Sequence, residues 1–214
     1  MARTPSFEFV PDELQVDGLV GIGGQLDVDT LKWAYAQGIF PWPQEGLPWL
    51  WFSPDPRGVL DFKDLKIAKS LQKFRRQHRD WNFTVNQNFP AVIKNCAQQR
   101  RPGQKGTWIL PDMITAYENL LAAGHLISVE VWAPSLDGNQ ELIGGIYGVL
   151  SEKYFSAESM FYKVSNASKL AFCYLLELLQ EQGLTWMDVQ MITPLTEAFG
   201  GKYISRNEFL QRIR

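Results

Sequence analysis

The 214-residue sequence contains little cysteine and little histidine, with two residues of each. No second Cys or His stands near Cys96 or Cys173 at the spacing of a zinc site, and two cysteines are too few for a disulfide framework. His78 and His125 have no nucleophile to pair with, so a catalytic triad is not expected. These absences predict reduced thiols, an intracellular protein and no metal.

A long apolar run and a large net charge are also missing. The N-terminal residues Met-Ala-Arg-Thr-Pro-Ser-Phe-Glu-Phe have no apolar core that would suit a signal peptide, and no later segment approaches a membrane span. The formal net charge is -2, so a polyanionic partner requires a local cluster of basic residues. We expect a cytoplasmic monomer that does not bind membranes.

Aromatic residues and prolines, in contrast, are concentrated between residues 38 and 57. Proline has no backbone N–H and fixes φ, so neither a helix nor an inner strand is expected in this stretch. The large aromatic side chains there are therefore not explained by packing within a helix or an inner strand. They are Phe40, Trp42, Trp49, Trp51 and Phe52, which are placed among Pro41, Pro43, Pro48, Pro54 and Pro56.

Periodicity and turn residues predict an α+β protein with two domains. A helix at 29–38 and a strand at 57–61 form a small mixed N-terminal domain, residues 1–62. Residues 63–214 form a larger domain whose consecutive strands are antiparallel. The further helices are expected at 65–79, 89–98, 111–123 and about 166–182, and the further strands at 82–85, 126–132, 142–150, 153–157 and 185–191.

Basic residues cluster in the predicted helix at 65–79. The block from Asp61 to Asp80 holds seven Lys or Arg and three Asp, in a chain that is acidic overall. Binding to a phosphate backbone needs such local density, but an ordinary solvated helix face has the same composition. Both interpretations stay open. The candidate residues are Lys69, Lys73, Arg75, Arg76 and Arg79.

Two polar residues interrupt the otherwise apolar strand at 185–191. Asp188 and Gln190 are two residues apart, so their side chains point to the same face. A buried carboxylate and carboxamide can orient an incoming amine and accept its proton. A solvated strand face or a structural hydrogen-bonded pair also explains the spacing. Glu158, which follows a strand and precedes a helix, is a third candidate, or else a capping or surface residue.

An ordered set of short motifs resembles the leucyl/phenylalanyl-tRNA–protein transferase family over nearly the whole chain. The set includes Ala34-Tyr-Ala-Gln-Gly-Ile-Phe-Pro-Trp42, Trp51-Phe-Ser-Pro-Asp-Pro-Arg57, Gly106-Thr-Trp-Ile109, Ser128-Val-Glu-Val-Trp132, Gly144-Gly-Ile-Tyr-Gly148, Glu158-Ser-Met-Phe161, Asn166-Ala-Ser-Lys169 and Asp188-Val-Gln190.

The resemblance implies a fold and an activity. Members of the family move Leu, Phe or Met from aminoacyl-tRNA to an N-terminal Arg or Lys of a protein, and so create an N-degron for protein degradation. Their C-terminal domain is similar to the acetyltransferase (GNAT) fold, with a mainly antiparallel central sheet. No cofactor is implied, because an aminoacyl ester is already activated.

Roles for individual residues follow from the same resemblance. Trp51 and Trp108 would hold the 3′-terminal adenosine of the tRNA, and Asp188, Gln190 and Glu158 would surround the reacting ester and amine. The basic helix would contact acceptor-stem phosphates. An apolar pocket for the transferred side chain would be formed by Ile146, Phe155, Phe172, Leu175 and Met187.

Two other functions remain as alternatives. An acyl-CoA-dependent N-acetyltransferase would have a Gln/Arg-x-x-Gly-x-Gly/Ala loop at a helix N-terminus for the CoA pyrophosphate, and the sequence has no such motif. A non-catalytic RNA-binding module would need the basic helix but not Asp188 and Gln190.

Overall fold

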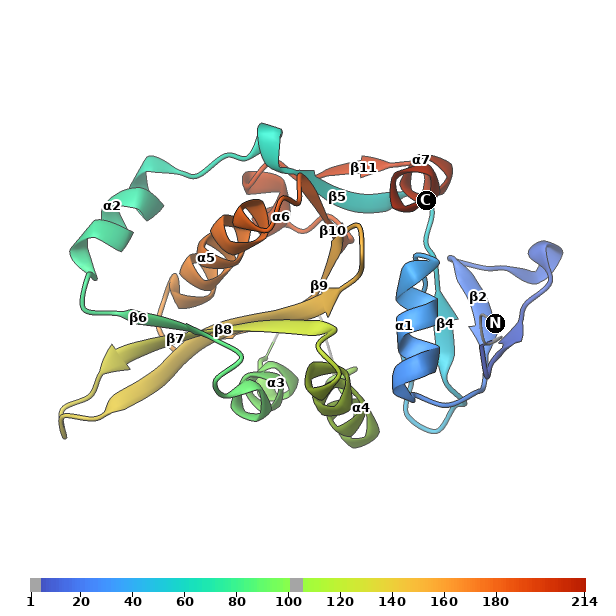
Figure 1. Cartoon of the computed structure of the whole chain (residues 1–214), viewed down its shortest axis with the longest axis horizontal. Coiled ribbons are helices and arrows are strands. Elements are labelled where there is room, and N and C mark those ends of the chain that lie inside the picture. The colour runs from blue at the N-terminus through green and yellow to red at the C-terminus, as the bar shows by residue number, and fades with distance from the viewer. Residues whose placement is uncertain (1–4, 101–105) are drawn as a thin grey trace.

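The computed structural model describes residues 5–100 and 106–214. Their strands form a four-stranded sheet of order β1-β2-β4-β3 and a seven-stranded sheet of order β11-β5-β10-β9-β8-β7-β6 (Figure 1). No helix within these residues is long and apolar enough to span a bilayer.

The small sheet and helix α1 make up the N-terminal unit. The helix α1 (Val28–Ala36) starts after Asp27, whose side chain accepts a hydrogen bond from the Thr30 N–H at 2.8 Å. This confirms the predicted helix, shifted by one or two residues. The strands are β1 (Glu8–Phe9), β2 (Leu19–Ile22), β3 (Phe40–Pro41) and β4 (Leu50–Phe52).

The stretch rich in proline and aromatics contains two of these strands. Pro41 lies in the edge strand β3, where a missing N–H is tolerated. The inner strand β4 runs between Pro48 and Pro54 and holds no proline itself. The expectation that this stretch has no inner strand was therefore wrong, because the prolines flank β4 rather than interrupt its hydrogen bonds.

Strand β5 (Arg57–Asp61) belongs to the large sheet, not to the N-terminal unit as expected. It is antiparallel to β10 (Trp186–Gln190) on one side and to β11 (Lys202–Ile204) on the other. Both partners come from the C-terminal part of the chain, so no local pattern around β5 indicates them. The chain passes from one sheet to the other between β4 and β5, before the predicted boundary at residue 62.

The large sheet is mainly antiparallel, as expected. Its remaining strands are β6 (Asn82–Val85), β7 (Leu126–Pro134), β8 (Gln140–Leu150) and β9 (Phe155–Tyr162). Among the described strands the parallel pairing is that of β9 with β10. The strand predicted at 153–157 runs on to residue 162, which brings Glu158 into the sheet.

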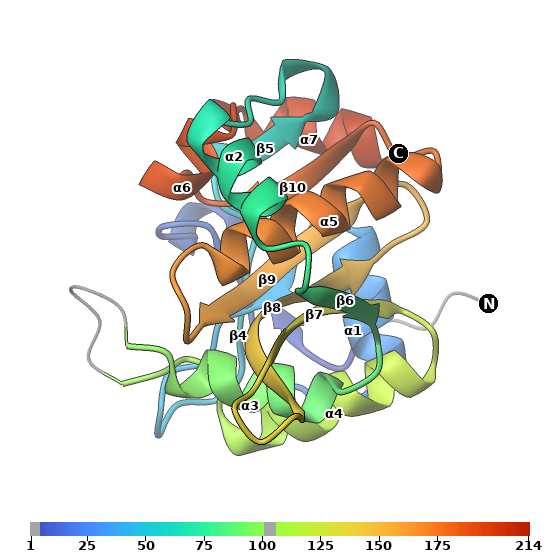
Figure 2. The same ribbon diagram turned by 90° about the vertical axis from the view of Figure 1, so that its left-hand side faces the viewer.

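Helices cover both faces of the large sheet (Figures 1 and 2). Helix α5 (Ala167–Glu181) packs on one face, with α2 (Lys69–Gln77) beside it, while α3 (Phe89–Gln98) and α4 (Pro111–Ala122) pack on the other. The basic helix is shorter than predicted, since a 3-10 turn, Phe62–Asp64, and extended residues precede it. At the C-terminus, α6 (Pro194–Ala198) and α7 (Arg206–Ile213) flank β11.

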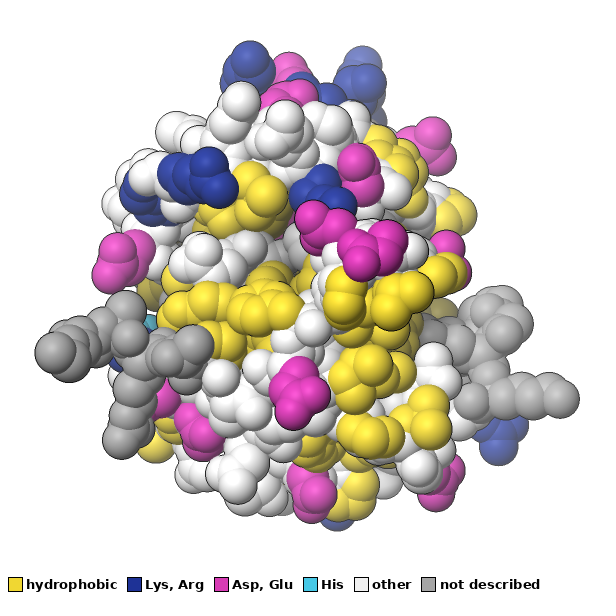
Figure 3. All heavy atoms as spheres, turned by 90° about the vertical axis from the view of Figure 1, so that its right-hand side faces the viewer, with side chains coloured by type: hydrophobic (Ala, Val, Ile, Leu, Met, Phe, Trp, Pro, Cys, Tyr) yellow, Lys and Arg dark blue, Asp and Glu magenta, His cyan; other side chains and the backbone are white. Residues whose placement is uncertain are grey.

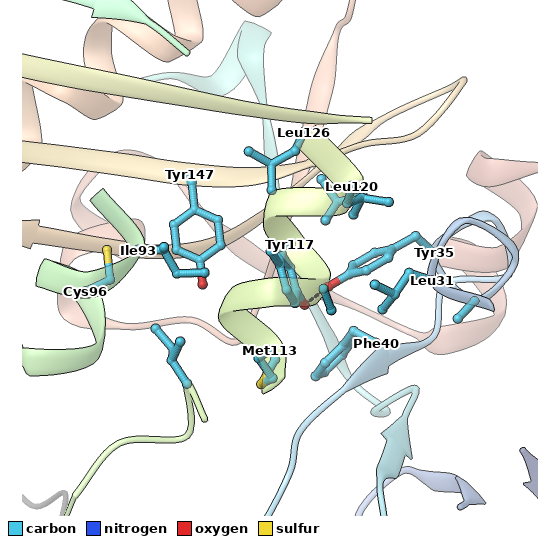
Figure 4. Close-up of a cluster of buried hydrophobic side chains, with 14 of the residues drawn as sticks. Leu31, Tyr35, Phe40, Ile93, Cys96, Met113, Tyr117, Leu120, Leu126 and Tyr147 are labelled. Carbon is cyan, nitrogen blue, oxygen red and sulfur yellow. Dashed lines mark hydrogen bonds between the residues drawn. The ribbon is translucent and has the colours of Figure 1, made fainter. Parts of the chain in front are cut away.

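The N-terminal unit shares one apolar core with the α3 and α4 face. Leu31 and Tyr35 of α1 are buried against Met113, Tyr117 and other residues of α4 (Figure 4). Each of these four side chains is at most 1% exposed. Because about 25 cal/mol is gained per Å² of apolar surface buried, this shared core holds the two units together.

Candidate active site

The site lies where the parallel strands β9 and β10 separate. They are paired at Phe155 with Met187 and at Ser156 with Asp188, and no further pairing of the two is formed. Both strands have an irregularity just beyond this point. On β9, Ala157 and Ser159 oppose successive residues of β8, so Glu158 is an extra residue, and on β10 the extra residue is Val189. Such bulges redirect side chains and are common beside active sites.

The two bulges bring the three predicted catalytic residues together. The Gln190 Nε2 donates to Glu158 Oε1 at 3.0 Å, and the Ser156 hydroxyl donates to Asp188 Oδ2 at 3.0 Å. Gln190 has φ of 60°, in the left-handed region that residues other than glycine rarely adopt. The predicted grouping of Asp188, Gln190 and Glu158 is therefore present in the structure.

The Asp188 carboxylate accepts four hydrogen bonds from three residues. Arg57 donates two of them, Nε to Oδ1 at 2.9 Å and Nη2 to Oδ2 at 2.7 Å. The Gln190 N–H donates to Oδ1 at 2.8 Å, and Ser156 supplies the fourth. Burial alone would lower the pKa of Arg57, but the charge of Asp188 raises it. The Asp188 carboxylate is thus held in place, because hydrogen bonds occupy about all of its four lone-pair positions.

The Glu158 carboxyl group has a pKa near neutral pH. Burial raises its pKa to about 7, against the lowering effect of a hydrogen bond from Tyr35 and with a further increase from the charge of Asp188. The Tyr117 hydroxyl donates to Glu158 Oε2 at 3.4 Å. It also lies 2.7 Å from the Tyr35 hydroxyl (Figure 4). Burial raises the pKa of both tyrosines well above 10, so both remain phenols.

The raised pKa of Glu158 predicts a change in stability with pH. Since the folded pKa is about 7 and the unfolded value 4.5, the folded protein binds more protons within that window and loses stability as the pH rises through it. Glu158→Gln removes this loss, so its free energy of unfolding relative to the original protein should be larger at pH 8 than at pH 5. Urea unfolding at the two pH values measures it.

The exposed Glu181 provides the control. Glu181→Gln is expected to leave the difference between pH 5 and pH 8 unchanged. Equal pH dependence of the Glu158 and Glu181 variants would show that the Glu158 carboxyl titrates normally in the folded protein.

The five residues predicted to form the apolar pocket lie in one buried cluster beneath α5. Met187 and Phe155 precede Asp188 and Ser156 by one residue, so they point to the opposite face of the sheet. None of the five is more than 2% exposed. The pocket residues and the catalytic group thus lie on opposite sides of the sheet, next to the place where β9 and β10 separate. The five are Ile146, Phe155, Phe172, Leu175 and Met187.

Of the two predicted adenosine-binding residues, Trp108 lies at the surface and Trp51 does not. Trp51 is 0% exposed, stacks on Phe7 at 4.5 Å between ring centroids and donates to the Gly23 carbonyl. Neither face of its ring is open to a base. Trp108 stacks instead on Trp42, at 5.8 Å and 30°, and both rings are half-buried. Nothing in the sequence distinguishes Trp42 from the other aromatic residues between positions 38 and 57.

The five basic candidates Lys69, Lys73, Arg75, Arg76 and Arg79 are all exposed, in α2 or just after it. Arg75 forms a double hydrogen-bonded ion pair with Glu177 of α5. No ion pair of Arg76 or Arg79 is found among the described residues. A hollow of about 350 Å³ lies between α2 and α5.

Figure 3 shows the opposite end of the molecule, away from α2, where hydrophobic side chains gather across the middle of the surface.

Several residues of the site had no predicted role. Arg57 ends a motif that the sequence analysis singled out, but its partner Asp188 lies 131 residues further along the chain. Ser156 and Tyr117 likewise gain their contacts only from the pairing of β9 with β10 and the packing of α4. In residues 5–100 and 106–214 no group of three His, Cys, Asp or Glu is arranged to hold a metal ion.

Known proteins of one family are similar to this chain over most of its length. Residues 59–214 match the family model of leucyl/phenylalanyl-tRNA protein transferase, and residues 24–55 match the model of its N-terminal domain. The leucyl/phenylalanyl-tRNA–protein transferase of Maridesulfovibrio salexigens is 44% identical over 95% of this chain and 82% of its own. That of Flavobacterium johnsoniae is 44% identical over 94% and 92%.

A solved structure supports the fold. The crystal structure of FemX overlaps with 83% of this chain and 66% of its own, with a TM-score of 0.51 and 10% identity. This likeness concerns the arrangement of strands and helices alone, and it agrees with the predicted GNAT-like architecture. Together, the matches to the two family models and to the relatives show that the chain belongs to the leucyl/phenylalanyl-tRNA–protein transferase family.

Proposed function

We propose that this protein transfers Leu, Phe or Met from aminoacyl-tRNA to the N-terminal Arg or Lys of acceptor proteins. The observation that carries the proposal is the contact of Gln190 with Glu158 at the separation of β9 and β10, in a chain of this family. A reaction that draws on aminoacyl-tRNA would take place in the cytoplasm, which is the location expected from the sequence.

The proposed reaction forms one peptide bond and breaks one ester bond. The acceptor amine attacks the ester carbonyl carbon, and the bond between that carbon and the ribose oxygen breaks. The proton lost by the amine must reach the ribose oxygen. Glu158, with a pKa of about 7, suits this transfer because a base whose pKa is near the working pH is most effective. The Gln190 carboxamide orients the amine beside it.

The tRNA end would be held by the Trp42 and Trp108 rings. A base stacked on an aromatic face contributes about 1–3 kcal/mol whatever its identity. The pair is half-buried, so it offers a rigid surface that is still accessible. Trp42 thereby takes the role that the resemblance had suggested for Trp51.

The transferred side chain would enter the apolar cluster beneath α5 between the diverging strands. Past Ser156 and Asp188 the residues of β9 and β10 are no longer paired, which leaves this part of the sheet able to admit an apolar group. Phe155 and Met187 form the pair just before Ser156 and Asp188, and their side chains lie in the cluster, so they would form the wall of the pocket. A pocket of this kind selects by shape and accepts Leu, Phe and Met to differing degrees.

Helix α2 would bind phosphates of the acceptor stem, which gives a prediction about salt. Replacing Arg76 and Arg79 with Ala should reduce the slope of log affinity against log salt by about 0.7–0.9 for each phosphate that is no longer neutralised. Arg75→Ala should change it less, because Arg75 is already paired with Glu177. Filter binding of charged tRNA over a salt series measures the slopes. Lys32→Ala in α1 is the control, and equal slopes in all variants would assign α2 to ordinary surface.

The proposed activity is tested with charged tRNA and short peptides. Labelled Leu or Phe should pass from its tRNA to peptides that begin with Arg or Lys, and not to matched peptides that begin with Ala or Glu. Labelled acetyl-CoA in a parallel reaction tests the acetyltransferase alternative. Acetyl transfer without aminoacyl transfer would overturn the proposal, and binding of tRNA without either transfer would favour an RNA-binding module.

A further inference from the structure

Arg57 is a buried cation at the junction of three parts of the fold. It is the first residue of β5 and is 1% exposed. Its guanidinium lies between the Phe40 ring of the N-terminal unit, at 4.7 Å, and the Phe209 ring of α7, at 4.5 Å. Aromatic faces attract a cation placed over them, and two such faces fix the plane of the guanidinium.

The ion pair of Arg57 with Asp188 has no access to solvent. The two side chains are 1% and 0% exposed. Removing both charges from water offsets much of their attraction, so a buried pair is weak evidence for a stabilising role. In addition, Arg57 Nη1 is buried and has no hydrogen-bond partner among the described residues. Stability alone therefore does not explain why this ion pair is buried here, and the reason is sought in the contacts that the pair makes with neighbouring residues.

The neighbour that depends on the pair is Gln190. Its N–H donates to the same Asp188 oxygen that accepts from Arg57 Nε. This hydrogen bond closes the bulge at Val189 and accompanies the left-handed backbone of Gln190. With that backbone the Gln190 carboxamide reaches Glu158 at 3.0 Å. A carboxylate free to rotate would not hold this arrangement.

We propose that Arg57 is a positioning residue for the transfer reaction. By binding Asp188 through two parallel hydrogen bonds, Arg57 fixes the carboxylate that holds Gln190 in its left-handed conformation, and so aims the carboxamide of Gln190 at Glu158. The inference rests on the proposed function. Arg57 acts through Asp188 and forms no hydrogen bond of its own with Glu158 among the described residues.

Arg57→Met should lower kcat by tenfold or more and leave KM for aminoacyl-tRNA within about threefold, because the residues that stack on the tRNA end are untouched. Arg57→Lys should recover only part of the rate, since Lys cannot form the two parallel bonds. Arg212→Met is the matched control. Arg212 also pairs with a β5 carboxylate, Asp61, and lies over the Trp186 ring at 5.6 Å, but it contacts none of the catalytic group. Its replacement should change kcat by less than about threefold.

A double variant separates positioning from folding. Arg57→Met leaves the Asp188 charge buried without its partner, which can unfold the protein, whereas Arg57→Met with Asp188→Leu removes both charges. We expect the double variant to regain the melting temperature of the original protein but to transfer no faster than Asp188→Leu alone. A double variant with the original kcat, or a folded Arg57→Met with the original kcat, would overturn the proposal.

Hydrogen exchange at the Gln190 amide gives a result that does not depend on activity. Exchange should be faster in Arg57→Met than in the original protein and unchanged in Arg212→Met. Failure of the original protein to transfer Leu or Phe would refute the proposed function and leave this measurement in place. Unchanged exchange in folded Arg57→Met would refute the positioning role and leave the proposed function in place.

Discussion

Replacing Gln190 with Ala should slow aminoacyl transfer by about 10²–10⁴-fold, the usual effect of losing a positioned acid–base or orienting group. Gln190 donates to Glu158 at 3.0 Å, and no other side-chain amide donates to Glu158 among the described residues. The change removes side-chain atoms alone and leaves the Gln190 N–H bond to Asp188 in place. Single-turnover transfer from bound Phe-tRNA gives the rate.

Affinity for charged tRNA should change little in the same variant, because the tryptophan pair and α2 lie outside the altered region. Gln180→Ala, at an exposed position of α5, is the control and should transfer within about threefold of the original rate. If Gln190→Ala transfers at the original rate, Gln190 has no part in the reaction. If it loses tRNA affinity as strongly as rate, Gln190 binds the tRNA end.

Replacing Phe172 with Ala should lower the free energy of unfolding by about 3–5 kcal/mol, the range for removing a buried aromatic ring. Phe172 is 2% exposed and packs edge-on against Phe199 of the loop after α6, at 4.9 Å between centroids. If the cluster beneath α5 also receives the substrate side chain, the new space should reduce transfer of Leu more than transfer of Phe, because the smaller side chain fills less of it. Urea unfolding and competition between charged tRNAs measure the two effects.

Phe89→Ala is the matched control for this pair of measurements. Phe89 is 0% exposed and packs against Tyr147 on the other face of the sheet. Its replacement should cause a similar loss of stability, while the ratio of Leu to Phe transfer stays constant. A constant ratio in Phe172→Ala as well would show that Phe172 belongs to the core and not to the pocket.

The geometry indicates different roles for Asp188, Gln190 and Glu158, which the sequence had grouped as one candidate catalytic set. Asp188 accepts hydrogen bonds from Arg57, Ser156 and the Gln190 backbone, so it is fixed in place. Glu158 has a pKa near 7 because it is buried beside another negative charge, which makes it the group suited to proton transfer. From the sequence, Asp188 is compatible with a catalytic or a structural role, and its hydrogen bonds favour an anchoring role close to the chemistry.

Local sequence determined the elements that depend on near neighbours. The apolar period of residues 29–38 predicted α1, although the cap is Asp27, and the apolar rows of residues 166–182 predicted α5. Two strand-like runs on either side of a polar turn predicted β7 and β8. The two-residue period of a strand also predicted that Asp188 and Gln190 lie on one face of the same strand. The basic cluster was visible as composition alone. Each of these features is set by residues within one or two turns, so it can be recognised without knowing the fold.

The tertiary structure alone decided the features that depend on distant residues. Strand β5 lies in the large sheet because β10 and β11 supply its hydrogen bonds, and Arg57 at its start thereby reaches Asp188. Burial decided that Trp51 is core and that Trp42 lies beside Trp108. It also set the pKa of Glu158. Strand pairing, burial and the pKa of a buried group each depend on many residues that folding brings together from distant parts of the chain. They therefore cannot be predicted from local sequence patterns.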